Sequence, residues 1–158
     1  MSNHFKSITY GILDYTQVIN QIAEYISSDP NSNYKIIVGT DSEAKTGEVD
    51  FVSAVIVHRL GKGGIYFWQK QTLQHQNSMQ QRLTQETQFS LELAWKIRDS
   101  FQHNGLSAYE PEVHIDVGMD GISRDMVKWV TGMILGSGFV YKIKPESFAA
   151  STVADRYT

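Results

Sequence analysis

Two aspartates follow short apolar runs of the kind that form buried β-strands. Residues 36–38 (Ile-Ile-Val) precede Asp41, and alternating apolar residues over 113–117 surround Asp116. A carboxylate at the end of a central strand loses its water, which costs several kcal/mol unless the group is paired or bound to a cation. For Asp41 the alternative is a turn residue that caps the loop 42–48. This stretch taken alone favours the turn, because Asp is common there.

A third acid, Glu86, falls on the apolar side of the longest helical pattern, residues 77–103. It comes three residues after Leu83 and four before Ser90, which both lie on that side. Glu86 is therefore expected to point towards a sheet. The alternative is a flanking position from which its long side chain reaches water. Neighbouring polar side chains such as Arg82 are interpreted as solvated.

Apolar periodicity and turn residues predict the elements that would position these acids. In chain order they are a helix over 15–28, strands over 34–40, 49–59 and 65–71, a helix over 77–103, a strand over 112–118, a helix over 122–135, a strand over 139–143 and a short helix over 147–157. Residues 1–14 are expected to form a short arm. The three tryptophans, Trp68, Trp95 and Trp129, are expected in the core.

The connections between these elements predict the sheet. Short turns make the first three strands antiparallel neighbours, whereas helical crossovers make the last two strands parallel to their neighbours. A mixed five-stranded α/β sheet with strand order 3-2-1-4-5, flanked by helices, satisfies both conditions. The first and fourth strands then lie side by side, with their carboxyl ends where open α/β sheets bind ligands. This arrangement places Asp41 next to Asp116.

Length and composition favour one compact domain. The chain of 158 residues fits a single domain over 1–158, in which 1–33 are an N-terminal arm and an additional helix. No apolar run approaches the roughly 20 residues that span a bilayer, and the N-terminus lacks the apolar core of a signal peptide. The chain has no Cys, which excludes a disulfide framework and a thiolate metal site and suits a cytoplasmic protein. The net charge of −3 argues against an extended nucleic-acid-coating surface, yet allows a cation-holding site that grips a few phosphates.

The order of elements resembles the ribonuclease H-like superfamily, in which acids end the first and fourth strands and also lie on the first long helix and the last helix. Four segments also resemble the YkuK-like family of bacterial proteins: Val-Gly-Thr-Asp-Ser-Glu (38–43), His-Ile-Asp-Val-Gly (114–118), Met-Val-Lys-Trp-Val-Thr-Gly-Met (126–133) and residues 144–157. That family is predicted to be ribonuclease H-related and lacks an established substrate. The resemblance covers about residues 8–158 and implies the fold more firmly than the activity.

The resemblance implies a set of catalytic and metal-binding acids: Asp41, Glu86, Asp116 and Asp155. Glu43 would replace Glu86 if Glu86 faces outward. Lys144 resembles a basic residue that some relatives keep near the last acid, and Lys144 or Arg156 would hold a phosphate oxygen. The sequence departs from the cellular ribonucleases H in one respect: no His lies just ahead of Asp155.

These residue types suit a reaction assisted by two metal ions. Phosphodiester hydrolysis must activate water and neutralise the leaving oxygen, and two Mg²⁺ or Mn²⁺ ions about 3.5–4 Å apart can do both. Mg²⁺ prefers hard oxygen ligands. We expect Asp41 to bridge the ions, with Asp116 on one and Asp155 on the other. Glu86 would orient water or complete a coordination shell.

The leading hypothesis is a metal-dependent nuclease that acts on RNA, an RNA/DNA hybrid or branched DNA. The alternative is a non-catalytic nucleic-acid- or protein-binding module on the same scaffold. Phosphoryl transfer to a small molecule would need a second domain to enclose a nucleotide, which only a dimer could supply. Tyr66, Trp68 and Lys70 on the third strand could form a nucleic-acid face or, equally, a homodimer interface. His114 is expected as a core or sheet-face side chain that could bind a softer ion.

Overall fold

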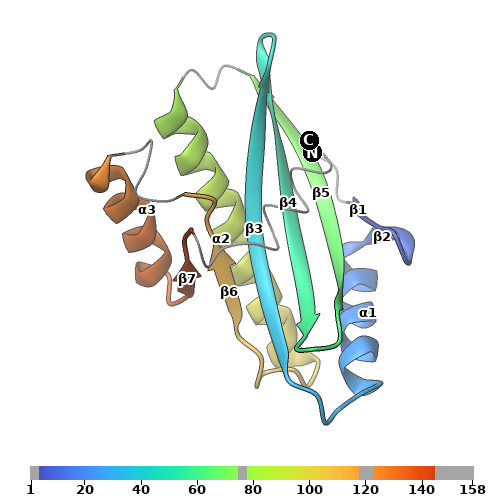
Figure 1. The fold of residues 1–158 in the computed structure, drawn as a ribbon. Helices are drawn as coiled ribbons and strands as arrows, with labels where there is room; N and C mark the ends of the chain where they lie inside the picture. Colours follow the sequence, from blue (N-terminus) through green and yellow to red (C-terminus); the bar gives the residue numbers. More distant parts are fainter. Residues whose placement is uncertain (1–3, 75–77, 118–122, 145–158) are drawn as a thin grey trace.

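A computed structural model describes residues 4–74, 78–117 and 123–144. These residues form one sheet with helices packed against it (Figure 1). The strands are β1 (His4–Ser7), β2 (Gly11–Asp14), β3 (Tyr34–Lys45), β4 (Glu48–Arg59), β5 (Gly64–Gln74), β6 (Pro111–His114) and β7 (Val140–Lys142). The helices are α1 (Tyr15–Ser27), α2 (Met79–His103) and α3 (Arg124–Gly136).

The sheet has the strand order β2-β1-β5-β4-β3-β6-β7. β3, β4 and β5 are antiparallel neighbours, whereas β6 runs parallel to β3 and β7 runs parallel to β6. Counted from β3, the last five strands therefore follow the order 3-2-1-4-5. The predicted α/β class and mixed central sheet are confirmed, and the structure adds two strands at one edge.

The two added strands come from the segment expected to be an arm. β1 pairs antiparallel with β2 and meets β5 where Lys6 lies opposite Trp68. Each of the two strands has four residues and buries one apolar side chain, Phe5 in β1 and Leu13 in β2. An alternation this short is too weak a pattern to predict a strand.

Each described helix begins at a capping side chain. Asp14 accepts a hydrogen bond from the backbone N–H of Gln17, and the Gln17 side chain accepts one from the backbone N–H of Asp14, which forms a capping box at α1. Ser78 caps α2, and Ser123 caps α3 as predicted. The predicted final helix over 147–157 lies outside the described residues. Of the helices that are described, none is long and apolar enough to cross a membrane.

α1 and α2 pack against the same face of β3, β4 and β5 (Figure 1). Successive side chains of a strand point to opposite faces, so Ile36 and Val38 of β3 face the helices, whereas Ile37 faces the other side. The side away from the helices carries a smaller buried cluster: Ile37, Val52, Ala54, Ile56 and Trp68. This alternation decides which polar residues of β3 can meet α2.

The core prediction for the tryptophans is right for one and wrong for two. Trp68 is buried, but Trp95 and Trp129 are 62% and 60% exposed. α3 instead buries Met126, Val127, Val130, Thr131 and Ile134. The inner face of a helix can be predicted from sequence to within about one residue, and Trp129 lies at the border of that face.

Candidate metal centre

Asp41 lies on β3, and Asp116 lies two residues beyond the end of β6, the parallel neighbour of β3. Gly39 of β3 is paired with His114 of β6, and each aspartate comes two residues further along its own chain. Side chains alternate along β3, so Asp41 points to the face opposite α2. β3 does not end at Asp41 as predicted; it continues to Lys45 as one half of a hairpin with β4. Asp41 is therefore a strand residue, which removes its interpretation as a turn cap.

Glu86 reaches the same region from the helix side of the sheet. Its side chain is 9% exposed, and its Oε2 accepts a hydrogen bond from the Ser42 hydroxyl. The backbone N–H of Ser42 donates to Oδ1 of Asp41 at 2.9 Å. Ser42 therefore connects two predicted site acids that are 45 positions apart in the chain. Glu86 faces inward, so Glu43, which is exposed on β3, is not needed in its place.

Arg82 is part of this cluster, contrary to its interpretation as solvated. Its Nε donates to the Ser42 hydroxyl at 3.1 Å, and its Nη2 donates to the Ser42 carbonyl oxygen at 2.8 Å. Sequence analysis missed both Ser42 and Arg82. The available signal was the spacing of four residues between Arg82 and Glu86, which places them on adjacent turns of one helix.

The charges in the cluster act on one another. The pKa of Glu86 is raised to about 7, first by burial and also by the negative charge of Asp116. The hydrogen bonds from Ser42 and the positive charge of Arg82 oppose this rise. Because the negative charge of Asp116 contributes to the raised pKa of Glu86, these two acids belong to one electrostatic cluster.

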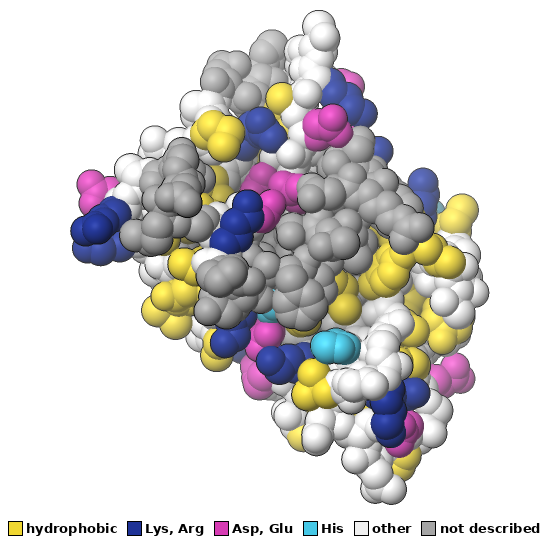
Figure 2. Space-filling model, in the orientation of Figure 1, with side chains coloured by type: hydrophobic (Ala, Val, Ile, Leu, Met, Phe, Trp, Pro, Cys, Tyr) yellow, Lys and Arg dark blue, Asp and Glu magenta, His cyan; other side chains and the backbone are white. Residues whose placement is uncertain are grey.

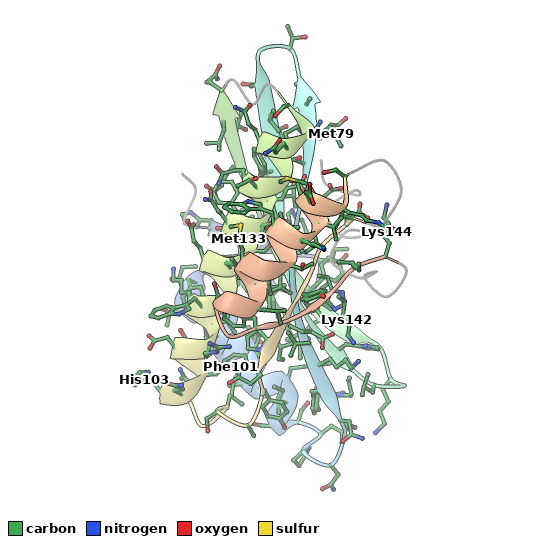
Figure 3. All side chains as sticks on the ribbon, turned by 90° about the vertical axis from the view of Figure 1, so that its left-hand side faces the viewer. Met79, Phe101, His103, Met133, Lys142 and Lys144 are labelled. Carbon is green, nitrogen blue, oxygen red and sulfur yellow. The ribbon has the colours of Figure 1, made fainter. Side chains whose placement is uncertain are left out.

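Lys144 forms an ion pair with Asp116. Its Nζ is 3.0 Å from Asp116 Oδ1, and its backbone N–H donates to the carbonyl oxygen of Val117 at 2.9 Å. Figure 2 shows acidic and basic side chains together near the middle of this face, and Figure 3 places Lys144 level with the upper half of α2. A positive charge is thus held at one of the predicted metal ligands.

A second set of buried hydroxyls fixes α2 to the sheet beside this cluster. The Thr40 hydroxyl accepts a hydrogen bond from Ser90 at 2.8 Å and lies 2.9 Å from the Ser53 hydroxyl. Each of these residues comes from a different element: β3, α2 and β4. Satisfied buried hydrogen bonds favour one register between packed elements. This register places Glu86 opposite Ser42.

The predicted site is only partly visible in the described chain. Asp155 and Arg156 lie outside the described residues. In residues 4–74, 78–117 and 123–144 there is no group of three His, Asp or Glu side chains that could hold a metal ion. The oxygen donors of Asp41, Asp116 and Glu86 nevertheless suit hard cations such as Mg²⁺ or Mn²⁺, and the ammonium on Asp116 shows that positive charge is accommodated there.

His114 is a buried strand histidine. Its Nε2 lies 2.8 Å from Glu112 Oε1, and burial lowers the pKa of the imidazole. This agrees with its expected place on the sheet.

Comparison with known proteins covers nearly the whole chain. A family model described as Ribonuclease H-like matches residues 17–158, a range that includes all four predicted acids. The chain is 28% identical over 165 residues to the "Uncharacterized protein YkuK" of Bacillus subtilis (strain 168), across 98% of this chain and 96% of that protein. No solved structure shows significant similarity to the chain.

Proposed function

Because the chain belongs to the ribonuclease H-like family, we propose that it is a metal-dependent nuclease that hydrolyses phosphodiester bonds in RNA, an RNA/DNA hybrid or branched DNA. The observation that supports this most is the parallel pairing of β3 with β6, because Asp41 and Asp116 each come two residues after the last pair, Gly39 and His114. Open α/β sheets bind ligands at the carboxyl ends of such strands. The carboxylates of Asp41 and Asp116 there, and that of Glu86, which Ser42 links to Asp41, would offer the oxygen donors that divalent cations prefer.

The proposed cofactors are two Mg²⁺ or Mn²⁺ ions. Asp41, Asp116 and Glu86 would hold them, with Asp155 completing the set. When bound, the ions would supply an activated water and neutralise the leaving oxygen.

The chain's own residues would prepare this site. Ser42 and Arg82 hold the Glu86 carboxyl in place, and a cation would displace the proton that Glu86 retains near neutral pH. Lys144 would leave Asp116 and hold a phosphate oxygen of the nucleic acid.

The direct test is cleavage of labelled RNA, RNA/DNA hybrid and four-way-junction DNA with Mg²⁺ and with Mn²⁺. We expect Asp41→Asn to lower the cleavage rate by about 100-fold or more, because it removes the shared ligand. Asp125→Asn, an exposed acid in the first turn of α3, is the matched control and should retain the rate. Equal rates for the wild-type protein and Asp41→Asn would remove this mechanism.

A non-catalytic nucleic-acid- or protein-binding module is the second candidate. It is favoured by the ion pair between Lys144 and Asp116, and by the lack of a three-ligand metal group in the part of the chain that is described. Binding of the same labelled nucleic acids without cleavage, with either metal present, would support this candidate instead.

A further inference from the structure

A hollow of about 500 Å³ lies where the N-terminal hairpin and α1 meet β5 and α2. It shares no residue with the candidate metal centre. Phe5 and Tyr15 of the N-terminal segment line one side, and residues of β5 and α2 line the other. Its volume falls in the range of about 300–1,000 Å³ that is usual for small-molecule sites.

The floor of the hollow is polar where the pattern of the strand predicts an apolar surface. Along the helix-facing side of β5, Ile65 and Phe67 belong to the core, and Gln69 and Gln71 follow on the same side. Both glutamines are half-buried and line the hollow. Within the described chain neither side-chain amide forms a hydrogen bond. Two amides therefore present unused donors and acceptors to this space.

The walls are apolar and held in place by neighbouring rings. Phe5, Phe89 and Leu93 line the hollow and are each less than 9% exposed. The Phe5 ring packs against Tyr15 at 6.3 Å, and the Phe89 ring packs edge-on against Phe51 at 5.3 Å. These contacts fix the rings before a ligand arrives, which reduces the entropy lost on binding.

The rim carries more negative than positive charge. Asp14 and Glu92 contribute carboxylates, whereas Lys96 contributes one ammonium, which lies 4.0 Å from the centre of the Tyr15 ring. The Asp14 carboxylate also caps α1. A phosphate at this rim would meet two carboxylates, so the rim disfavours anionic ligands.

We infer that this hollow binds an uncharged nucleobase or nucleoside through the amides of Gln69 and Gln71. A glutamine amide offers a donor and an acceptor side by side, which matches the hydrogen-bonding edge of a base and of adenine in particular. The flat faces of a base pack well against aromatic side chains. The inference does not depend on the proposed nuclease activity.

Two sources could supply the base: a free nucleoside, or an unpaired base within a nucleic-acid chain. The charge of the rim favours the free nucleoside, because a chain brings phosphates with it. The test therefore uses adenosine, guanosine, cytidine, uridine, AMP and a short single-stranded oligonucleotide.

The experiment is titration of the full-length protein by calorimetry, together with NMR of the glutamine side-chain amides in the wild-type protein. We expect saturable binding of at least one nucleoside, with shifts of the Gln69 and Gln71 amide signals and weaker binding of AMP than of adenosine. Gln69→Leu and Gln71→Leu should each weaken binding about tenfold, since each removes hydrogen bonds to the base. Gln88→Leu, on the exposed side of α2, is the matched control and should bind like the wild-type protein.

Two results would overturn the inference: no binding of any of the four nucleosides, or unchanged affinity in both leucine variants. The amide shifts in the wild-type protein keep the test decisive even if a variant fails to fold. Shifts of the same two amides with the oligonucleotide would identify a base within a chain as the ligand, and shifts with nucleosides alone would identify the free form.

Discussion

The carboxyl group of Glu86 is buried, and burial disfavours its charged form. Its pKa is raised to about 7, because the hydrogen bonds from Ser42 and the charge of Arg82 offset only part of the rise that burial causes. A carboxyl that keeps its proton near neutral pH can exchange that proton for a cation. If a cation binds as proposed, Glu86 would couple the stability of the protein to the occupancy of the candidate metal centre.

We expect Glu86 to make the metal-free protein less stable as the pH rises from about 4.5 to about 7. The folded-state pKa lies above the unfolded value, so the stabilisation is complete below the unfolded pKa and is lost as the pH passes through the folded pKa. Relative to Glu86→Gln, the wild-type protein should lose on the order of 3 kcal/mol of unfolding free energy over this range. Urea unfolding in the presence of a chelator measures this, and a difference that stays constant with pH would contradict it.

Ser42 is expected to position the two acids that it contacts. Ser42→Ala removes the hydroxyl that donates to Glu86 and accepts from Arg82, which should cost about 1–3 kcal/mol of unfolding free energy. Mn²⁺ affinity should fall about tenfold, because the Glu86 carboxyl is no longer held. Ser137→Ala, at the exposed end of α3, should change stability by less than about 0.5 kcal/mol. Unfolding and Mn²⁺ titration of both variants test this, and an unaltered Mn²⁺ affinity in Ser42→Ala would show that Ser42 has no positioning role.

At the scale of elements, β3 is longer than its neighbour β6, and Asp41 lies in the part of β3 that extends past β6. β3 pairs with β6 only from Ile36 to Gly39, but it continues with β4 as far as Lys45. The residues from Thr40 onwards are thus paired on one side and extend past the end of β6 (Figure 1). Asp41 lies just past this transition, where β3 is still paired with β4 but no longer with β6.

The sequence predicted which segments form helices and strands better than it predicted where each of them begins and ends. The apolar run 36–38 predicted β3, but its last five residues are polar or small and are held by the hairpin with β4, which a local pattern does not show. The strands β1 and β2 were missed because an alternation over four residues is too short to predict a strand. α3 was predicted correctly except for the rotation that exposes Trp129.

The corrected face of α3 can be tested with two neighbouring residues. Ile134 is fully buried, whereas Leu135 is 58% exposed. Ile134→Ala should cost about 2–5 kcal/mol of unfolding free energy, because it leaves a cavity in the core. Leu135→Ala should change it by less than about 0.5 kcal/mol. Chemical denaturation of both variants gives the comparison, and equal costs would mean that the rotation of α3 is wrong.

At the scale of the whole molecule, the topology brings distant acids together. The parallel pairing of the strands that precede Asp41 and Asp116 was predicted from sequence alone and is confirmed, because parallel crossovers allow few arrangements. The inward side of Glu86 followed from helical periodicity. Ser42 and Arg82 could not be predicted in the same way, since their contacts depend on how α2 is rotated and shifted against β3.

Divalent cations should stabilise the folded protein if the candidate centre binds them. At a Mn²⁺ concentration about 100 times the dissociation constant, the gain is about 2.7 kcal/mol of unfolding free energy. Asp41→Asn and Asp116→Asn should each lose most of this gain, whereas Asp125→Asn should keep it. Thermal unfolding with and without Mn²⁺ measures the effect, and an equal gain in all three variants would place the binding elsewhere.

The most direct measurement is the position of Mn²⁺ located by anomalous scattering in crystals grown or soaked with the ion. We predict density for Mn²⁺ coordinated by oxygens of both Asp41 and Asp116, with Glu86 or a water that it orients completing the shell. Lys144 should then have moved away from Asp116. Crystals that hold Mn²⁺ only at other positions, or that show the carboxylates of Asp41 and Asp116 too far apart to share an ion or a pair of ions, would contradict the account.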